Sequence, residues 1–307
     1  MGRIAEALKR AQQERARRRE SESDGPGAGP ADASPVCGGA HRDKGPARGD
    51  RDDVLSRASM LSAPPAKPFI VSSSPILPEC IDPRVVVLHD ARSVFAERYR
   101  SARTRLLTAN PDGSTRVFAI TSSLPKEGKT VTTANLAFSL AELRHLRVAM
   151  LDFDFRRRGL SRLCQVADKP GVAEVLRGEK TLAEVCLPAV RANLHLVPTG
   201  DPREASPSEL LVGERVAALM KEISERFHYA LIDTPPTSTV ADIGLIGPLC
   251  HAAVIVVRMG RTPEPLLRQC AQLLQANHVL IAGAILAGEC DELMVGSDNR
   301  DYGNNPP

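Results

Sequence analysis

Six short apolar runs, separated by helical stretches, limit the possible fold of this chain most strongly. Each run is continuously apolar, which is typical of strands that are buried on both faces of a parallel sheet. The runs are Val117–Thr121, Arg147–Leu151, Leu194–Val197, Tyr229–Ile232, Ala253–Val257 and Leu280–Leu286. The helical stretches are Ser93–Leu107 and residues 129–143, 172–177, 207–227, 241–248 and 264–276. This alternation predicts an α/β fold in which helices cover both faces of a parallel sheet.

The chain divides into four segments by composition. Residues 1–19 carry seven Lys or Arg against two Glu and are predicted to form a basic helical arm. Residues 20–66, rich in Gly, Pro, Ser, Ala and Asp, are predicted to be a disordered linker. Residues 67–290 contain the apolar runs and form the expected folded domain. Residues 291–307 are polar and are predicted to be a flexible tail.

Two details of this division remain open. At the start of the domain, Phe69–Val71 and Val85–Leu88 could form short edge strands. The basic arm could be a solvated helix, or it could dock on a membrane surface or a partner. Because the arm lacks aromatic residues and any reading motif, and the net charge is only +3, no specific nucleic-acid partner is expected.

Composition also bears on where the protein works. Hydrophobic residues make up 42% of the 307 residues and aromatic residues only 3%, so the core must be mainly aliphatic. The seven cysteines include no Cys-x-x-Cys pair, which argues against a disulfide framework and fits a reducing compartment. No apolar stretch approaches the roughly 18 residues of a membrane span, and the N-terminus does not resemble a secretory signal. We therefore expect a cytoplasmic protein, which a partner could hold at the inner face of the membrane.

A phosphate-binding loop is predicted between the first apolar run and the helix that follows it. The segment Ser123–Thr130 ends in Gly-Lys-Thr, in the strand–loop–helix context that such a loop requires. Lys129 would reach the terminal phosphates, and the hydroxyl of Thr130 would bind Mg²⁺. The alternative is an ordinary corner between a strand and a helix, since Ser123 replaces the first glycine of the usual pattern. The predicted nucleotide-binding residues are Ser123, Pro125, Lys126, Glu127, Gly128, Lys129, Thr130 and Val131.

Carboxylates follow two other apolar runs. Asp152 and Asp154 follow the second run, and Asp233 follows the fourth. Because parallel strands present ligand sites at their carboxyl ends, these acids are expected beside the phosphate loop. Thr130, Asp152 and Asp233 are the predicted Mg²⁺ ligands, and Asp152 is also the candidate general base. The catalytic set is thus Lys129, Asp152, Asp154 and Asp233, unless these acids only cap the following turns.

These motifs together resemble the cytoplasmic domain of the bacterial tyrosine kinases of capsule and exopolysaccharide synthesis, over about residues 84–290. The resemblance implies a P-loop NTPase-like fold, ATP and Mg²⁺ as cofactors, protein-tyrosine kinase activity and a membrane-embedded polysaccharide co-polymerase as activator. The matching segments are Ser123–Thr130 (Walker A), Leu151–Arg157 (Walker A′), Leu231–Pro236 (Walker B), Ser206–Leu211 (similar to Pro-Asn-Pro-x-Glu-Leu-Leu) and Arg3–Lys9 (similar to the N-termini of some members).

A further segment resembles the motif through which this family associates into rings, Glu-x-x-Arg-x-x-Arg. Its residues here are Glu97, Arg100 and Arg103. The spacing of three places them along one side of a helix, where they could reach a neighbouring copy. The alternative is a salt bridge within one helix, which would contribute only a few tenths of a kcal/mol on a surface. The resemblance favours a homo-oligomer.

The chain departs from the pattern of this family at two places and from that of a related family at one. Members usually end in clustered tyrosines that are autophosphorylated, whereas Tyr302 is the single tyrosine of this tail and the possible phosphorylation site. The last strand commonly ends in Asn near the adenine, whereas this run is followed by Ala287. The related partition and division-site ATPases carry an extra lysine where this chain has Leu124, which argues against their sandwich-dimer mechanism here. Two alternatives therefore stand beside the kinase: a non-kinase ATPase switch, and a nucleotide-binding scaffold of a polysaccharide export complex.

Overall fold

The computed structural model describes residues 74–111, 113, 116–203, 206–238 and 242–288. The expected basic arm, the linker, the Phe69–Val71 strand and the tail with Tyr302 lie outside these residues. Within the described part of the chain, no helix has the length and apolar character that crossing a membrane requires.

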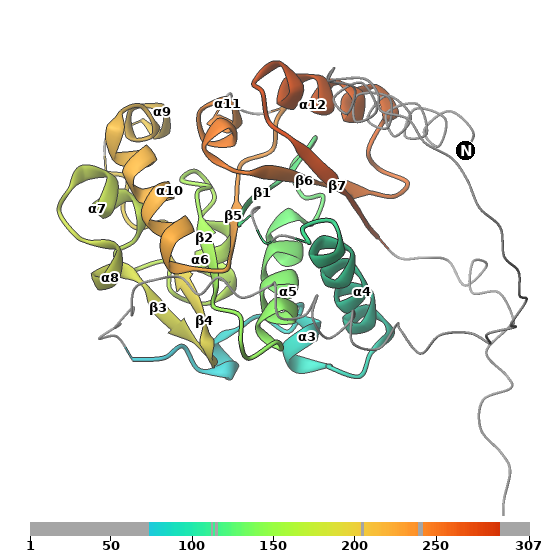
Figure 1. The fold of residues 1–307 in the computed structure, drawn as a ribbon, viewed down its shortest axis with the longest axis horizontal. Coiled ribbons are helices and arrows are strands. Elements are labelled where there is room, and N and C mark those ends of the chain that lie inside the picture. Colours follow the sequence, from blue (N-terminus) through green and yellow to red (C-terminus); the bar gives the residue numbers. More distant parts are fainter. Residues whose placement is uncertain (1–73, 112, 114–115, 204–205, 239–241, 289–307) are drawn as a thin grey trace, which may run out of the picture. The chain divides into compact units, whose positions relative to one another are not determined.

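A seven-stranded sheet, with strand order β3-β4-β2-β5-β1-β6-β7, forms the centre of the described residues (Figure 1). All neighbouring strands are parallel except β3 and β4, which are antiparallel. Each of the six predicted runs is a strand. The strands are β1 (Val117–Ser122), β2 (Val148–Asp152), β3 (Leu187–Ala189), β4 (Arg191–Val197), β5 (Tyr229–Asp233), β6 (Ala252–Arg258) and β7 (Ile281–Ala287).

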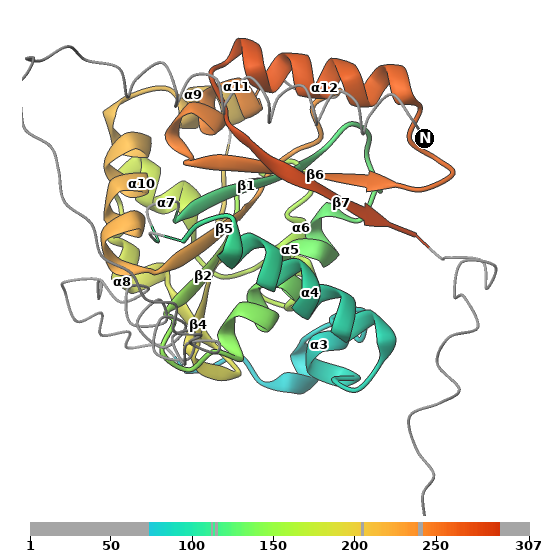
Figure 2. The ribbon, with the colours of Figure 1, turned by 45° about the vertical axis from the view of Figure 1, so that its right-hand side comes forward.

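Helices cover both faces of this sheet, as the apolar runs predict (Figure 2). Alternate residues of β1 enter opposite cores: Val117 and Ala119 pack with α7–α12, whereas Phe118 and Ile120 pack with α3–α6. The helices are α3 (Val86–His89), α4 (Val94–Thr108), α5 (Lys129–Ala141), α6 (Gly159–Leu163), α7 (Val172–Arg177), α8 (Leu182–Val185), α9 (Pro207–Leu211), α10 (Glu214–Arg226), α11 (Asp242–Ile246) and α12 (Glu264–Ala276), with 3₁₀ turns η1 (Pro78–Cys80) and η2 (Gly247–Leu249).

The expected edge strand at Val85–Leu88 is wrong, because this segment forms the single helical turn α3. Val85 and Val87 are fully buried, and the Val87 N–H donates to Asn135 Oδ1 of α5 at 3.0 Å. The β-branched residues alone would favour a strand, but here a side chain of α5 accepts the backbone N–H that a neighbouring strand would otherwise bind.

The expected continuous helix over residues 207–227 is also wrong, because it is two helices, α9 and α10. Gly213 lies between them with φ 124°, a backbone conformation that a helix does not contain and that glycine adopts most readily. The elements that periodicity did not reveal are α6, α8 and β3, each of three to five residues. They are too short to show a hydrophobic period.

Two arginines and one glutamate connect α4 to the end of α5. The Arg100 guanidinium grips both oxygens of Glu142, with Nη2–Oε1 at 2.7 Å and Nε–Oε2 at 2.9 Å. Arg103 Nη1 donates to Glu142 Oε2 at 2.8 Å and to the Ser139 carbonyl at 2.7 Å. Glu97 accepts a further bond from Arg100. The two arginines expected to reach a neighbouring copy thus contact α5 within the chain.

Removing the Glu142 charge is expected to destabilise the fold. Hydrogen bonds from Arg100 hold the pKa of Glu142 below its usual range, and the Arg103 bonds act in the same direction. Glu142→Gln should lower the free energy of unfolding at pH 7 by about 1–3 kcal/mol. Because the pKa of Glu142 is lower in the folded state, its carboxylate stabilises the fold at pH values above the unfolded pKa of about 4.3. The stability difference between Glu142→Gln and wild type should therefore shrink as the pH falls below that value. Chemical denaturation at pH 7 and pH 3 measures both values.

A matched variant serves as the control. On α12, Glu264 forms an i,i+4 ion pair with Arg268, but both side chains are more than half exposed. Glu264→Gln should therefore change stability by less than about 0.5 kcal/mol. Equal losses at both positions would contradict a special role for Glu142.

Candidate functional site

The loop between β1 and α5 has the backbone geometry of an anion-binding site. Lys126 and Gly128 both adopt left-handed conformations, with φ 65° and φ 100°. Left-handed residues in such a turn make a concavity of backbone N–H groups that binds anions. Gly128 also precedes the first turn of α5, where the helix N-terminus adds partial positive charge. The loop that the sequence predicts to bind phosphate therefore has a backbone conformation suited to an anion.

The buried side chain of Glu127 stabilises this loop through hydrogen bonds. It is fully buried, and its Oε2 accepts a bond from the Leu124 N–H at 2.9 Å. Its Oε1 accepts a bond from the Thr262 hydroxyl, which in turn accepts one from the Arg258 N–H at 3.0 Å. Ser123 is buried as well, so these two predicted nucleotide-binding residues support the loop rather than line its open side.

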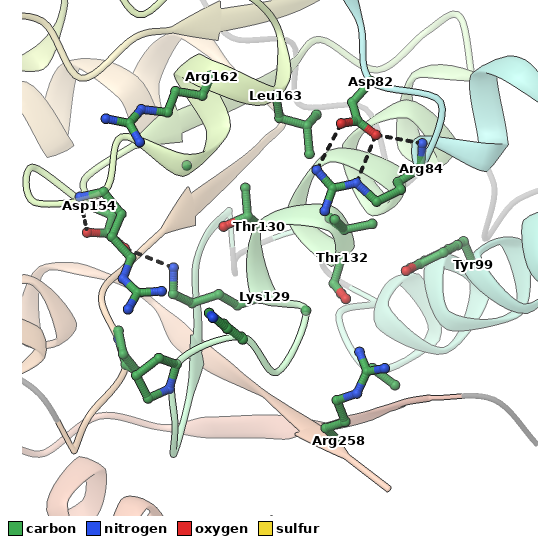
Figure 3. Close-up of a pocket in the computed structure, with 18 residues that line it drawn as sticks. Asp82, Arg84, Tyr99, Lys129, Thr130, Thr132, Asp154, Arg162, Leu163 and Arg258 are labelled. Carbon is green, nitrogen blue, oxygen red and sulfur yellow. Dashed lines mark hydrogen bonds and ion pairs between the residues drawn. The ribbon is translucent and has the colours of Figure 1, made fainter. Parts of the chain in front are cut away.

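The open side of the loop faces a cavity of about 720 Å³ (Figure 3). Six of the predicted nucleotide-binding residues line it: Pro125, Lys126, Gly128, Lys129, Thr130 and Val131. A cavity of this size is within the usual range for small-molecule ligands. Residues outside the loop that also line it include Asp82, Arg84, Tyr99, Asp154, Arg157, Gly159, Arg162, Arg258 and Ala287.

Two of the predicted acids contact the residues that end the phosphate loop. Lys129 Nζ lies 3.0 Å from Asp154 Oδ2 and 3.5 Å from Asp233 Oδ1. The Thr130 hydroxyl donates to Asp233 Oδ2 at 2.7 Å. Strand register explains this convergence, since Asp233 on β5 pairs with Ile120 on β1. The sequence prediction that these side chains meet at one edge of the sheet is therefore confirmed for Lys129, Thr130, Asp154 and Asp233.

Burial and charge act against each other in this cluster. Burial raises the pKa of Asp233 to about 7, although the Lys129 ammonium opposes this and the hydroxyl of Thr130 adds a favourable bond. Burial lowers the pKa of Lys129, but Asp233 and Asp154 outweigh it, so the net pKa is raised. The lysine is thus held as a cation inside the protein by the carboxylates around it.

Asp152 has a different environment from the other two acids. It is fully buried, and its Oδ2 accepts bonds from both the N–H and the hydroxyl of Ser161, each at 2.8 Å. Its Oδ1 accepts the Asp154 N–H at 3.1 Å. Burial raises its pKa, and the bonds from Ser161 oppose that shift. In this structure Asp152 connects the end of β2 to α6 and lies behind the cavity wall.

The space beside Thr130 and Asp233 depends on Gly159, the first residue of α6. A Cβ at this position would lie 2.9 Å from Thr130 Oγ1 and 3.6 Å from Asp233 Oδ2. A hydroxyl and a carboxylate are the hard oxygen donors that Mg²⁺ prefers. Within the described residues, no three His, Cys, Asp or Glu side chains form a metal-binding group. The residues present therefore fit a Mg²⁺ ion that keeps water and phosphate oxygens as its other ligands.

Several residues that line the cavity were not predicted from the sequence. Gly159 and Arg162 lie on α6, which is too short to recognise, although their place just after the Asp152–Asp154 pair was a usable signal. Tyr99 and Arg258 come from α4 and the end of β6. Nothing in the sequence connects these two positions with each other or with the loop, because only the packing of α4 and the strand order bring them together.

Comparisons with known proteins find relatives that are named as bacterial tyrosine-protein kinases or as a polysaccharide biosynthesis protein. The chain is 30% identical over 203 residues to the succinoglycan biosynthesis transport protein ExoP of Rhizobium meliloti, covering 66% of this chain and 26% of ExoP. It is 27% identical over 205 residues to the tyrosine-protein kinase YwqD of Bacillus subtilis, covering 67% of this chain and 86% of YwqD. The chain therefore spans about a quarter of the length of ExoP but most of YwqD.

A comparison of the fold with solved structures also finds a bacterial tyrosine kinase domain. The structure of the kinase domain of the Escherichia coli tyrosine kinase ETK matches with a TM-score of 0.63 at 27% identity, covering 66% of this chain and 79% of that domain. No protein-family model matches the chain.

Adding one methyl group at residue 159 is expected to impair metal-dependent binding. Gly159→Ala would displace the Thr130 hydroxyl from Asp233, because a separation of 2.9 Å is too short for a Cβ. Overpacking of this kind costs about 1–3 kcal/mol, so ATP affinity with Mg²⁺ should fall roughly 5- to 150-fold. ATP affinity in EDTA should be unchanged. Calorimetric titration under the two conditions measures this, and equal losses in both would contradict a metal site here.

Proposed function

Because the chain is related in sequence and in fold to the bacterial tyrosine kinases, we propose that it is a Mg-ATP-dependent protein-tyrosine kinase of exopolysaccharide or capsule synthesis and export. One observation carries this proposal: Lys129, Thr130, Asp154 and Asp233 converge where the phosphate loop opens into a cavity. The names of several relatives support both parts, since ExoP is named for succinoglycan biosynthesis and others are named as tyrosine-protein kinases.

The chain's own residues would share the work of phosphoryl transfer. The loop N–H groups and the start of α5 would bind the phosphates, and Lys129 would neutralise the terminal ones. Thr130 and Asp233 would hold Mg²⁺, which when bound supplies positive charge against the phosphoryl oxygens. The phosphoryl group would pass from ATP to a tyrosine oxygen, leaving ADP, and the tyrosine proton would go to a carboxylate.

The identity of that carboxylate is a separate question. We retain Asp152 as the proposed base and metal ligand, with Asp154 in support. For this role Asp152 would have to exchange its bonds from Ser161, because both its oxygens are occupied. Asp154 already lines the cavity and holds the Lys129 ammonium. Asp152→Asn and Asp154→Asn therefore form a pair of variants that separates the two positions in a turnover assay.

We also propose that the protein associates with itself and with a membrane-embedded polysaccharide co-polymerase at the cytoplasmic face of the membrane. The outer side of α4 supports self-association. Val94 and Phe95 are large apolar side chains that are more than half exposed, and the neighbouring Glu97 side chain is 65% exposed. Exposed apolar and aromatic side chains are enriched at contacts between protein copies, and charged residues lie at the rim.

The kinase proposal predicts phosphotyrosine that depends on the phosphate loop. Purified protein incubated with Mg-ATP and the cognate activator should acquire phosphotyrosine, detected by antibody and mass spectrometry. Lys129→Ala should abolish it, because the cation that binds the terminal phosphates is lost. Tyr302→Phe should abolish modification of the tail. The two described tyrosines are poor acceptors, since Tyr229 is 3% exposed and Tyr99 is half-buried.

The other outcomes favour the alternative functions. ATP hydrolysis without phosphotyrosine would contradict the kinase and favour the ATPase switch, which the single tail tyrosine already makes a candidate. Neither nucleotide binding nor turnover would leave only the scaffold.

The oligomer proposal predicts a loss of mass. Arg100→Ala combined with Arg103→Ala should lower the mass measured by light scattering at concentrations where the wild type associates. Because both arginines also hold Glu142, the Glu142→Gln variant is the matched control. An unchanged mass in the double variant, or an equal fall in Glu142→Gln, would contradict a direct contact between copies.

A further inference from the structure

Strand order determines which way a bound nucleotide must run through the cavity. The phosphate loop follows β1, which lies between β5 on one side and β6 on the other. Asp233 ends β5, and Asp154 follows β2 on that same side. Thr130 and these carboxylates would hold a Mg²⁺ ion beside the terminal phosphates of ATP. The nucleoside must therefore extend to the opposite side, where β6 and β7 end.

Three residues from separate elements line the cavity on that side. Arg258 ends β6, Ala287 ends β7, and Tyr99 reaches in from α4. The end of β7 touches the phosphate loop, since a Cβ at Gly128 would lie 3.6 Å from the Ala287 Cβ. In Figure 3, the Tyr99 hydroxyl points toward Thr132 of α5, with which it is hydrogen-bonded, and the Arg258 guanidinium lies on the same side of the cavity.

Arg258 combines a fixed backbone with an available side chain. Its N–H donates to Thr262 Oγ1 at 3.0 Å, and Thr262 donates to Glu127 of the phosphate loop. Its side chain is exposed, and within the described residues no carboxylate pairs with it. Arg84, which also lines the cavity, differs because Asp82 binds it at 2.8 Å. A planar guanidinium without a carboxylate can lie flat on a nucleobase.

We propose that Arg258 and Tyr99 form the nucleoside subsite, and that the base is held by stacking with little selection between ATP and GTP. This inference rests on the proposed nucleotide site. Stacking tolerates any base, because every base has a π face. Strong selection needs side chains that bond to the base edge, and a pocket built on them can reject an analogue by about 10⁴-fold. At the end of β7, Ala287 offers only a methyl group.

The test compares nucleotides with a ligand that has no nucleoside. Dissociation constants are measured calorimetrically for Mg-ATP, Mg-GTP and Mg-tripolyphosphate. Arg258→Ala should weaken both nucleotides roughly 5- to 100-fold, as expected for loss of one stacking partner. It should leave tripolyphosphate binding unchanged. Wild type should bind ATP and GTP within about tenfold of each other, since no base-edge bond separates them.

Control variants make each result decisive. Arg261→Ala removes the same charge from an exposed position three residues away that does not line the cavity, and it should change nothing. Tyr99→Leu should act as Arg258→Ala does, and Tyr99→Phe keeps the ring in case Tyr99→Leu does not fold.

Other outcomes would overturn this inference. One is unchanged ATP binding in Arg258→Ala. Another is a wild-type preference for ATP over GTP of more than about a hundredfold. The third is a loss of nucleotide binding in Arg84→Ala but not in Arg258→Ala. Loss of tripolyphosphate binding would indicate damage to the phosphate loop, because this ligand has no nucleoside. If wild type bound neither tripolyphosphate nor ATP, the proposed function itself would fail.

Discussion

The buried ammonium of Lys129 is the interaction on which the rest of the site depends. Its side chain is 8% exposed, and it lies between Asp154 and Asp233, which are 1% and 0% exposed. A buried charge is tolerated only when it is paired and hydrogen-bonded. Asp152 is fully buried a short distance behind them, so the acids outnumber the base in this region. Such an arrangement favours a bound divalent cation, whose charge would compensate the surplus carboxylate and a phosphate chain together.

The fold supplies the supports that hold this arrangement in place. Parallel register sets Asp152 beside Asp233 at the carboxyl ends of β2 and β5. The N–H and the hydroxyl of Ser161 both donate to one oxygen of Asp152. Glu127 connects the phosphate loop to Thr262 in the segment after β6. Ser161 and Glu127 do this without lining the cavity themselves. Their effect is to fix the backbone from which Lys129 and Asp154 extend, so that little rearrangement accompanies binding.

Sequence patterns predicted the features that depend on local chemistry. The strands at Val117–Thr121 and Tyr229–Ile232 were recognisable because burial on both faces requires continuous apolar residues. The phosphate loop was recognisable because its chemistry requires Gly128, Lys129 and Thr130 at fixed spacing. The sheet edge that gathers Asp154 and Asp233 follows from the same reasoning, since parallel strands carry their ligand sites at one end.

The features that were missed depend on contacts between distant segments. Val85–Leu88 has the composition of a strand, but its buried valines and its bond to Asn135 make it a helical turn. The arginines of α4 have the spacing of an interface, yet their partner in this structure is Glu142, 39 and 42 positions along the chain. Tyr99 and Arg258 meet one cavity only because α4 packs on α5 and β6 lies beside β1. No local pattern encodes such neighbours.

Helix α4 contacts both ends of α5. Tyr99 lines the cavity beside the first turn of α5, and Arg100 and Arg103 grip Glu142 just beyond its last turn. The same helix exposes Val94 and Phe95 on its outer side. Helices packed in this way shift as rigid elements. A displacement of α4 from outside would therefore move a wall of the cavity relative to the phosphate loop, so that contacts made at its outer surface and nucleotide binding act on the same element.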